Sequence, residues 1–180
     1  MKKTLVALSL SLASTAALAN TGSINFYGQV HAGTCPIDII DPATGSPIAR
    51  VNMGNVNVAQ FANAGDEAGS RAFGMRVTPG VGSCTVPANG NATVAFTAAY
   101  GGVGTGGTLY GLEPGGATNL ALIIKDNAGT PVDNGLVSKA YPLDDTNPTT
   151  MIFSAAYKST AAGVTAGAAN TDVQFLVTIQ

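Results

Sequence analysis

The last eight residues of the chain, Val173 to Gln180, read VQFLVTIQ. Large apolar residues recur at every second position, which predicts a β-strand with one face toward a core. The residues on that face are Val173, Phe175, Val177 and Ile179. A strand this regular must pair with a neighbour. If one edge of this strand had no partner strand in the same chain, the fold would have an exposed apolar surface and an unpaired edge. A strand added from another molecule would cover both.

Alternation of apolar and polar residues recurs throughout the chain, whereas helical spacing with caps is not found over any long window. The sequence therefore predicts an all-β fold. The expected strands lie near residues 23–31, 50–58, 72–78, 92–99, 119–125, 150–157 and 171–179. Segments rich in Gly, Pro, Asn and Asp separate them, including a loop at 60–70. Short strands joined by such turns are typical of a two-sheet sandwich, most commonly an immunoglobulin-like one.

The N-terminus has the features of an export signal. Lys2 and Lys3 precede an apolar stretch that runs to Ala13 and is too short to span a bilayer. Small residues follow, and Ala17-Leu18-Ala19 fits the pattern that signal peptidase recognises. We therefore predict a signal peptide over residues 1–19, cleaved before Asn20, and a single mature domain over residues 20–180. A cut after Ala16 is the weaker alternative.

Two cysteines, Cys35 and Cys84, accompany this export signal. In an exported chain such a pair predicts a disulfide. The bridge would close the loop between the two residues and contribute roughly 4 kcal/mol on the chain-entropy model. A four-ligand metal site is not expected, because His31 is the chain's one histidine and no further thiol is present.

Composition and motifs give no sign of catalysis. Only 10% of residues are charged and the net charge is −2, so no field favours nucleic acid, and the sparse charge suits a surface that packs against copies. A Ser-His-Asp or Cys-His mechanism would depend on His31 alone. We therefore expect no enzyme activity, no catalytic residue and no cofactor.

Two patterns that could suggest a site have simpler interpretations. The carboxylate pairs Asp38/Asp41 and Asp144/Asp145 stand among turn residues, where Asp commonly binds its own backbone. The glycines of Gly101–Gly107 match G-x-G-x-x-G, but no helix pattern follows them as a dinucleotide site requires. We expect turns in the first case and a loop between strands in the second.

Several motifs together resemble the pilin family of chaperone–usher fimbriae, of which the type 1 major subunit is an example. They are GSINFYGQV at 22–30 followed by Cys35, MGNV at 53–56, the segment 73–84, LIIKD at 122–126, FSAAY at 153–157, and GAANTDVQFLVTIQ at 167–180. The last is the most specific, because Gly167 precedes the alternating strand at the spacing seen in that family. The resemblance covers essentially the whole mature chain.

This resemblance implies an incomplete immunoglobulin-like sandwich that lacks its final strand and is completed by a donor strand from another subunit. A periplasmic chaperone would hold the subunit first and would grip the carboxylate of Gln180, and an outer-membrane usher would export it. The four inward residues of the terminal strand would line or flank the acceptor groove. The product would be a head-to-tail polymer of fimbrial subunits on the cell surface, serving adhesion.

The donor arm that the resemblance implies is short. Its candidate residues are Asn20, Thr21, Gly22, Ser23, Ile24 and Phe26. If Ile24 and Phe26 fill a neighbour's pockets, they cannot also stay in their own sheet. The family usually has tyrosine at the penultimate position, where this chain has Ile179, which keeps the apolar face without a phenolic hydroxyl.

The short arm leaves a second interpretation open, namely a tip or minor subunit that accepts a strand, donates none and binds a receptor, for example a host glycan. Its stacking surface would come from Tyr100 and Tyr110, on either side of the glycine-rich loop. The competing interpretation of these two tyrosines is ordinary packing at strand ends.

Overall fold

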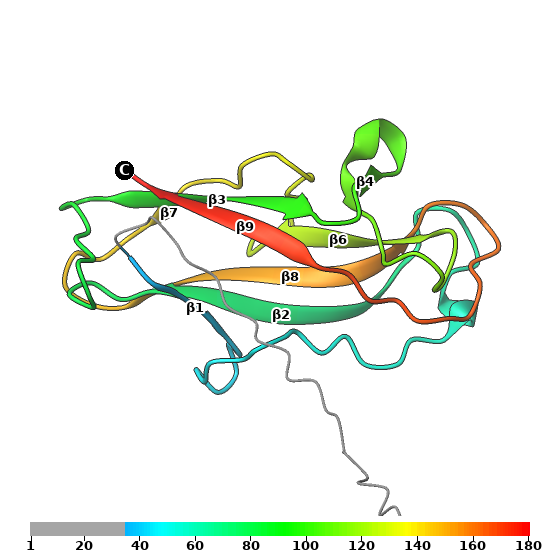
Figure 1. Cartoon of the computed structure of the whole chain (residues 1–180), viewed down its shortest axis with the longest axis horizontal. Helices are drawn as coiled ribbons and strands as arrows, with labels where there is room; N and C mark the ends of the chain where they lie inside the picture. The colour runs from blue at the N-terminus through cyan, green and yellow to red at the C-terminus, as the bar shows by residue number, and fades with distance from the viewer. Residues whose placement is uncertain (1–34) are drawn as a thin grey trace, which may run out of the picture. The chain divides into compact units, whose positions relative to one another are not determined.

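The computed structural model describes residues 35–180 (Figure 1). The predicted signal peptide, the candidate donor arm at 20–26, the strand expected at 23–31 and His31 lie outside these residues. The described elements, in chain order, are β1 (Ile37–Ile40), η1 (Val58–Gln60), β2 (Glu67–Val77), β3 (Asn91–Ala98), β4 (Gly102–Val103), η2 (Thr105–Gly107), β5 (Leu109–Tyr110), β6 (Leu120–Asp126), β7 (Tyr141–Pro142), β8 (Thr149–Ser159) and β9 (Val173–Ile179).

The strands form two antiparallel sheets. One has six strands in the order β1-β2-β8-β6-β5-β4, and the other has three in the order β7-β3-β9. Every pairing between neighbouring strands is antiparallel. The predicted all-β sandwich is therefore confirmed.

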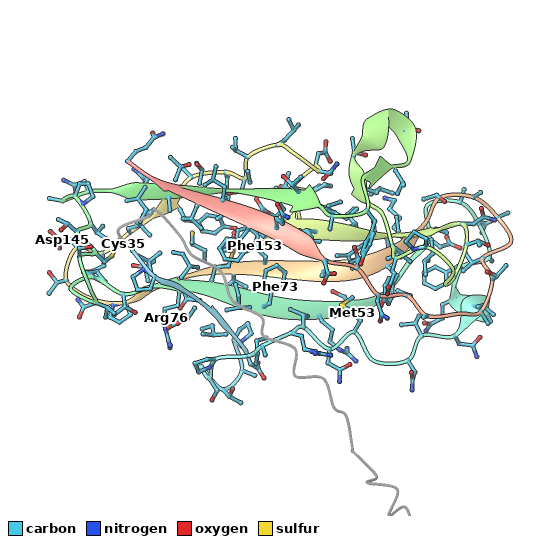
Figure 2. The ribbon with its side chains drawn as sticks, in the orientation of Figure 1. Cys35, Met53, Phe73, Arg76, Asp145 and Phe153 are labelled. Carbon is cyan, nitrogen blue, oxygen red and sulfur yellow. A yellow bond between two sulfur atoms is a disulfide. The ribbon has the colours of Figure 1, made fainter. Side chains whose placement is uncertain are left out.

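An aromatic cluster joins the two sheets. Phe96 on β3 lies 5.1 Å from Phe153 on β8 and 6.2 Å from Phe73 on β2, measured between ring centroids, with edge-on geometry in both cases. Tyr141 on β7 lies 5.3 Å from Phe153. Figure 2 shows Phe73 and Phe153 in the space between the sheets. Phe153 is fully buried, so the core is centred on this ring.

One side of the sandwich is closed by the connection between β6 and β7. Its start hydrogen-bonds to β6, from Val132 N to Ile124 O at 2.9 Å. Its later part hydrogen-bonds to β3, from Gly135 N to Phe96 O and from Ser138 N to Val94 O, both at 2.8 Å. The connection therefore passes from the larger sheet to the smaller one along that side. The edges on the other side of the two sheets are β1 and β9.

The expected strands near 72–78, 92–99, 119–125, 150–157 and 171–179 correspond to β2, β3, β6, β8 and β9. β2 begins earlier, at Glu67, so it takes in the end of the loop expected at 60–70. It can do so because a β-bulge between Ala68 and Arg71 absorbs the irregular stretch, with Gly69 at φ +71°.

The strand expected at 50–58 is not formed, and that prediction was wrong. Gly54 has φ +69°, which interrupts an extended run. The side chain of Asn52 accepts from Gly54 N and that of Asn57 from Ala59 N, both at 2.9 Å, so two amides bond locally instead of to a strand. The segment is extended but unpaired, and it ends in η1.

The predicted disulfide between Cys35 and Cys84 is present, with the two Cα atoms 4.2 Å apart. Cys84 is buried in the core cluster. The bridge ties the start of β1 to the loop between β2 and β3. In residues 35–180 there is no helix with the length and apolar character needed to cross a membrane.

Candidate strand-acceptor edge

β9 is an edge strand. It pairs with β3 along its whole length, from Ala98↔Val173 to Ala92↔Ile179, and Figure 1 shows it, in red, alongside β3. Within residues 35–180 no strand pairs with its other side. A seven-residue strand with a free edge is a template for pairing with another chain.

Hydrogen bonds at its two ends show which backbone groups of β9 face that free edge. Asn91 and Gln180 exchange both possible bonds, each at 2.9 Å, and at the other end Ala99 N donates to Asp172 O at 2.9 Å. Hydrogen-bonded and non-hydrogen-bonded pairs alternate along an antiparallel ladder. The residues whose N–H and C=O face β3 are therefore Gln174, Leu176 and Thr178. Those whose backbone groups face the open edge are Val173, Phe175, Val177 and Ile179.

The same four residues turn their side chains toward the core. They are partly buried and pack against the main hydrophobic cluster, whereas Gln174, Leu176 and Thr178 are exposed. Along a strand, the direction of the side chain and the direction of the backbone N–H and C=O groups both alternate with a period of two. Each residue of β9 with an inward side chain therefore also has backbone groups that face the open edge. An incoming strand would find a row of hydrogen-bonding groups and a row of incompletely covered apolar side chains together. The alternation predicted for this strand is confirmed, while the role of these four residues stays a prediction.

Apolar residues from the opposite sheet edge pack against the same cluster. They are Ile37, Ile39, Val51, Met53 and Val56, all partly buried. In the described part of the chain, the backbone of residues 51–56 makes one hydrogen bond, from Gly54 N to Asn52 Oδ1 at 2.9 Å. The sequence did not lead us to predict this second row of apolar residues beside the core. Its alternating pattern was visible, but we interpreted it as a paired strand.

The chain is fixed where it enters β9. Ala117 N donates to Ala168 O at 2.7 Å, the hydroxyl of Tyr157 donates to Ala169 O at 2.7 Å, and the hydroxyl of Thr171 donates to Gly111 O at 2.6 Å. A Cβ at Gly167 would lie 2.7 Å from Ala117 N, so a side chain there would push these segments apart. This close approach gives a physical reason for the glycine ahead of the terminal strand.

At the other end, Gln180 continues the ladder past β9 through its two backbone hydrogen bonds with Asn91. Its side chain is exposed. The sheet therefore holds Gln180 in place.

The two tyrosines proposed as a glycan-stacking surface do not form one. Tyr110 is fully buried, its hydroxyl donates to Val132 O at 2.7 Å, and burial raises the pKa of its hydroxyl. The prediction that it could stack on a ligand was wrong, because the ring fills the core. Tyr100 is 37% exposed, and its hydroxyl donates to Asp172 Oδ2 at 3.2 Å.

The turn interpretation was wrong for Asp38, which lies in β1 and pairs with Arg76 at 3.0 Å. It fits Asp41, whose Oδ1 accepts from Ala43 N at 2.8 Å. Asp144 Oδ1 accepts from Thr146 N at 2.8 Å and from Asn147 N at 2.7 Å, and these bonds lower the pKa of its carboxyl group.

The glycines of 101–107 lie in β4 and the short η2, and β5 follows them instead of a helix. The loop interpretation therefore holds only in part, because Gly102 and Val103 form a short strand. Residues 35–180 contain no group of three or more His, Cys, Asp or Glu side chains arranged to hold a metal ion.

Comparison with known proteins agrees with this geometry. The family model described as "Fimbrial protein" matches residues 24–180. The type-1 fimbrial protein A chain of Escherichia coli K12 is 34% identical, covering 95% of this chain and 93% of that protein. The type 1 fimbrial subunit of Klebsiella pneumoniae is 32% identical with the same coverage.

Solved structures share the fold. A Burkholderia pseudomallei antigen and type I fimbria protein aligns with a TM-score of 0.57 and 29% identity, covering 81% of this chain and 99% of that one. The P pilus rod subunit PapA aligns with a TM-score of 0.59 and 22% identity, covering 82% of this chain and 100% of that one.

Proposed function

This chain belongs to the Fimbrial protein family, the chaperone–usher pilins, and we propose that it joins its neighbours by accepting a strand at the open edge of β9. As a family member it is a structural, non-enzymatic subunit that polymerises with other subunits into an adhesive fimbria on the cell surface. The proposal concerns which residues make the joint.

The proposal rests on one observation about β9: the residues with unpaired backbone groups are the same residues whose inward side chains are only partly covered. Val173, Phe175, Val177 and Ile179 are the residues whose backbone groups face the free edge, and their side chains are those left partly exposed beside the core. An added strand would satisfy the first row and cover the second. Covering the exposed remainder would contribute up to about 1 kcal/mol for each side chain, in addition to the hydrogen bonds.

The donor in this proposal is the N-terminal arm of the next subunit, with Ile24 and Phe26 as its apolar residues and Asn20 to Ser23 ahead of them. Donor and acceptor surfaces then differ, and a contact of this kind gives an open, head-to-tail polymer instead of a closed ring. Ile37, Ile39, Val51, Met53 and Val56 would flank the added strand on the side opposite β9, since they pack on the same cluster.

A periplasmic chaperone would occupy the same edge before assembly, and an outer-membrane usher would exchange it for the donor arm. The support in this chain is the terminal residue. The ladder with Asn91 holds Gln180 directly after β9, with one of its oxygens accepting from Asn91 N, so its carboxylate stands at a fixed place at the end of the strand. A basic partner could bind this carboxylate and align its own strand with β9 at the same time.

The experiment adds synthetic peptides to the chain purified from the periplasm and follows its melting temperature. One peptide has residues 20–31 of this chain, the second the matching segment of a co-encoded subunit, and the third residues 20–31 with Ile24 and Phe26 replaced by Asp. We expect the first two, or one of them, to raise the melting temperature, and the third to have no effect. A rise with the co-encoded peptide alone would assign the chain to a tip or minor position.

Two neighbouring residues provide matched variants. Phe175→Ser removes an inward side chain and is expected to abolish most of the rise, whereas Leu176→Ser changes an outward side chain on the same strand and is expected to keep it. If none of the peptides stabilises the wild-type chain, strand acceptance at β9 is refuted.

A further inference from the structure

Met53 is the one methionine of the predicted mature chain that is not fully buried. The chain has four methionines, and Met1 belongs to the predicted signal peptide. Met75 on β2 and Met151 on β8 are fully buried, whereas Met53 is only partly buried. Both cysteines of the chain are joined in the disulfide, so no free thiol competes with the thioether of Met53 for an oxidant.

Met53 lies in the segment 51–56, which follows the edge of the larger sheet beyond the end of β1. β1 pairs only with residues 74–77 of β2 and leaves the earlier part of that strand without a partner on this side. The segment approaches this part, because a Cβ at Gly54 would lie 3.1 Å from Arg71 Nη2. Figure 2 labels Met53 beside the larger sheet.

The side chain of Met53 is turned toward the core. Val51 and Met53 pack against the main hydrophobic cluster, while Asn52 between them is exposed. The inward residues of β9 pack against the same cluster from the smaller sheet. Since β1 and β9 are the sheet edges on this side of the sandwich, a strand added to β9 would pass beside Met53 and cover its sulfur.

A thioether in this position can be oxidised by a peroxide. The sulfur donates an electron pair to one oxygen of hydrogen peroxide, so that an S–O bond forms as the O–O bond breaks. Sulfur is oxidised by two electrons, and the other oxygen is reduced and leaves as water with both protons. The product is methionine sulfoxide, which is polar, and methionine sulfoxide reductases return it to the thioether.

We propose that Met53 is a site of reversible oxidation, and that its sulfoxide weakens acceptance of a donor strand at the edge of β9. The inference rests on the proposed function, because the sulfoxide can act on assembly only if a strand is added at this edge. The oxidant would reach subunits before assembly. In the fibre the added strand would shield the sulfur, so assembled subunits would stay reduced.

The sulfoxide acts through hydration. Its oxygen is a strong hydrogen-bond acceptor that can bind water while the edge is open. An apolar strand laid over it would remove that water and offer no donor in exchange, and burying a polar group without a hydrogen bond is unfavourable. We expect the dissociation constant of the donor peptide to rise by about tenfold or more.

The test treats the chain purified from the periplasm with hydrogen peroxide, alone and with bound donor peptide, and locates added oxygen by mass spectrometry. We expect Met53 to be oxidised in the free chain while Met75 and Met151 stay intact, and to stay reduced in the complex. The dissociation constant then follows from the melting temperature at increasing peptide concentration. It should rise on oxidation and return after treatment with methionine sulfoxide reductases.

Two variants separate the sulfur from the fold. Met53→Leu keeps an apolar side chain of similar volume and should bind the peptide as before, with no response to peroxide. Met53→Gln introduces a polar group of similar length and should reproduce the weaker binding without any oxidant. A peroxide effect that persisted in Met53→Leu would assign the loss to another residue and overturn the inference.

Two further results would also overturn it. One is complete oxidation of Met53 with an unchanged dissociation constant, and the other is equal oxidation of Met53 in the free chain and in the complex. Both leave strand acceptance intact. If the unoxidised wild-type chain takes up no donor peptide, the proposed function itself fails, and the inference fails with it.

Discussion

Removing the disulfide is expected to cost the domain a large part of its stability. The bridge spans a sequence separation of 49 and holds the start of β1, an edge strand of only four residues. For a loop of that length the chain-entropy relation gives a loss of about 4 kcal/mol in the free energy of unfolding. Natural domains have a total of about 5–15 kcal/mol, so the double variant Cys35→Ala/Cys84→Ala should be marginal.

The assay is urea unfolding followed by circular dichroism, with thermal melting as a second readout. A loss of about 4 kcal/mol corresponds to a fall in melting temperature of roughly 8–16 °C for a domain of this size. Cys35→Ala and Cys84→Ala are the controls. Each breaks the same bond, so each should lose nearly as much as the double variant, with a small additional loss at the buried Cys84.

The reasoning would be refuted if the double variant lost less than about 1 kcal/mol. It would also be refuted if the two single losses added up in the double variant, because one bond can be lost only once.

Three further changes test the core, the bulge and an ion-pair cluster. Phe153→Ala should lose about 3–5 kcal/mol of unfolding free energy because the ring is fully buried between the sheets, while the exposed Leu136→Ala should lose under about 0.5 kcal/mol; equal losses in urea unfolding would contradict the assigned core. Gly69→Ala should destabilise more than Gly80→Ala, since both glycines have positive φ but only the Cβ at 69 would meet Val56 Cγ2, at 2.5 Å; equal melting temperatures would contradict this. Partial burial opposes ionisation of Glu67, but hydrogen bonds and charge from Lys125 and Lys158 outweigh it and lower its pKa below the ordinary 4.5. Glu67→Gln should therefore lose up to about 1 kcal/mol near neutral pH and nothing once both folded and unfolded carboxyls are protonated; a loss that persisted in urea unfolding at low pH would refute the pairing.

Much of the fold could be predicted from period-two alternation. β3 and β9 alternate clearly, because one face of their sheet meets the core and the other meets solvent. β8 and β6 were also placed to within a few residues, although β6 is buried at consecutive positions from Ala121 to Ile124 and shows a continuous apolar run instead of alternation. β4, β5 and β7 were missed, because two-residue strands carry no periodic signal. The four-residue β1 was missed as well.

The candidate site could be predicted only in part. The inward residues of β9 follow from the alternation, but the phase of its hydrogen bonds depends on the pairing of Asn91 with Gln180, which the local pattern does not contain. Alternation at 50–58 identified extended chain and could not show that it lacks a partner strand. Tyr100 and Tyr110 stand in similar glycine-rich contexts, and only packing distinguishes the exposed ring from the buried one.

Residue-resolved hydrogen exchange on β9 tests the central claim most directly. The measurement compares the chain alone with the chain bound to the peptide of residues 20–31, or to the co-encoded peptide if that one binds. We predict that the amides of Val173, Phe175, Val177 and Ile179 exchange fast in the free chain and become strongly protected in the complex. The amides of Gln174, Leu176 and Thr178, which already bond to β3, should be protected in both states. Protection that does not follow this alternation, or that does not change when the peptide binds, would contradict strand addition at the edge of β9.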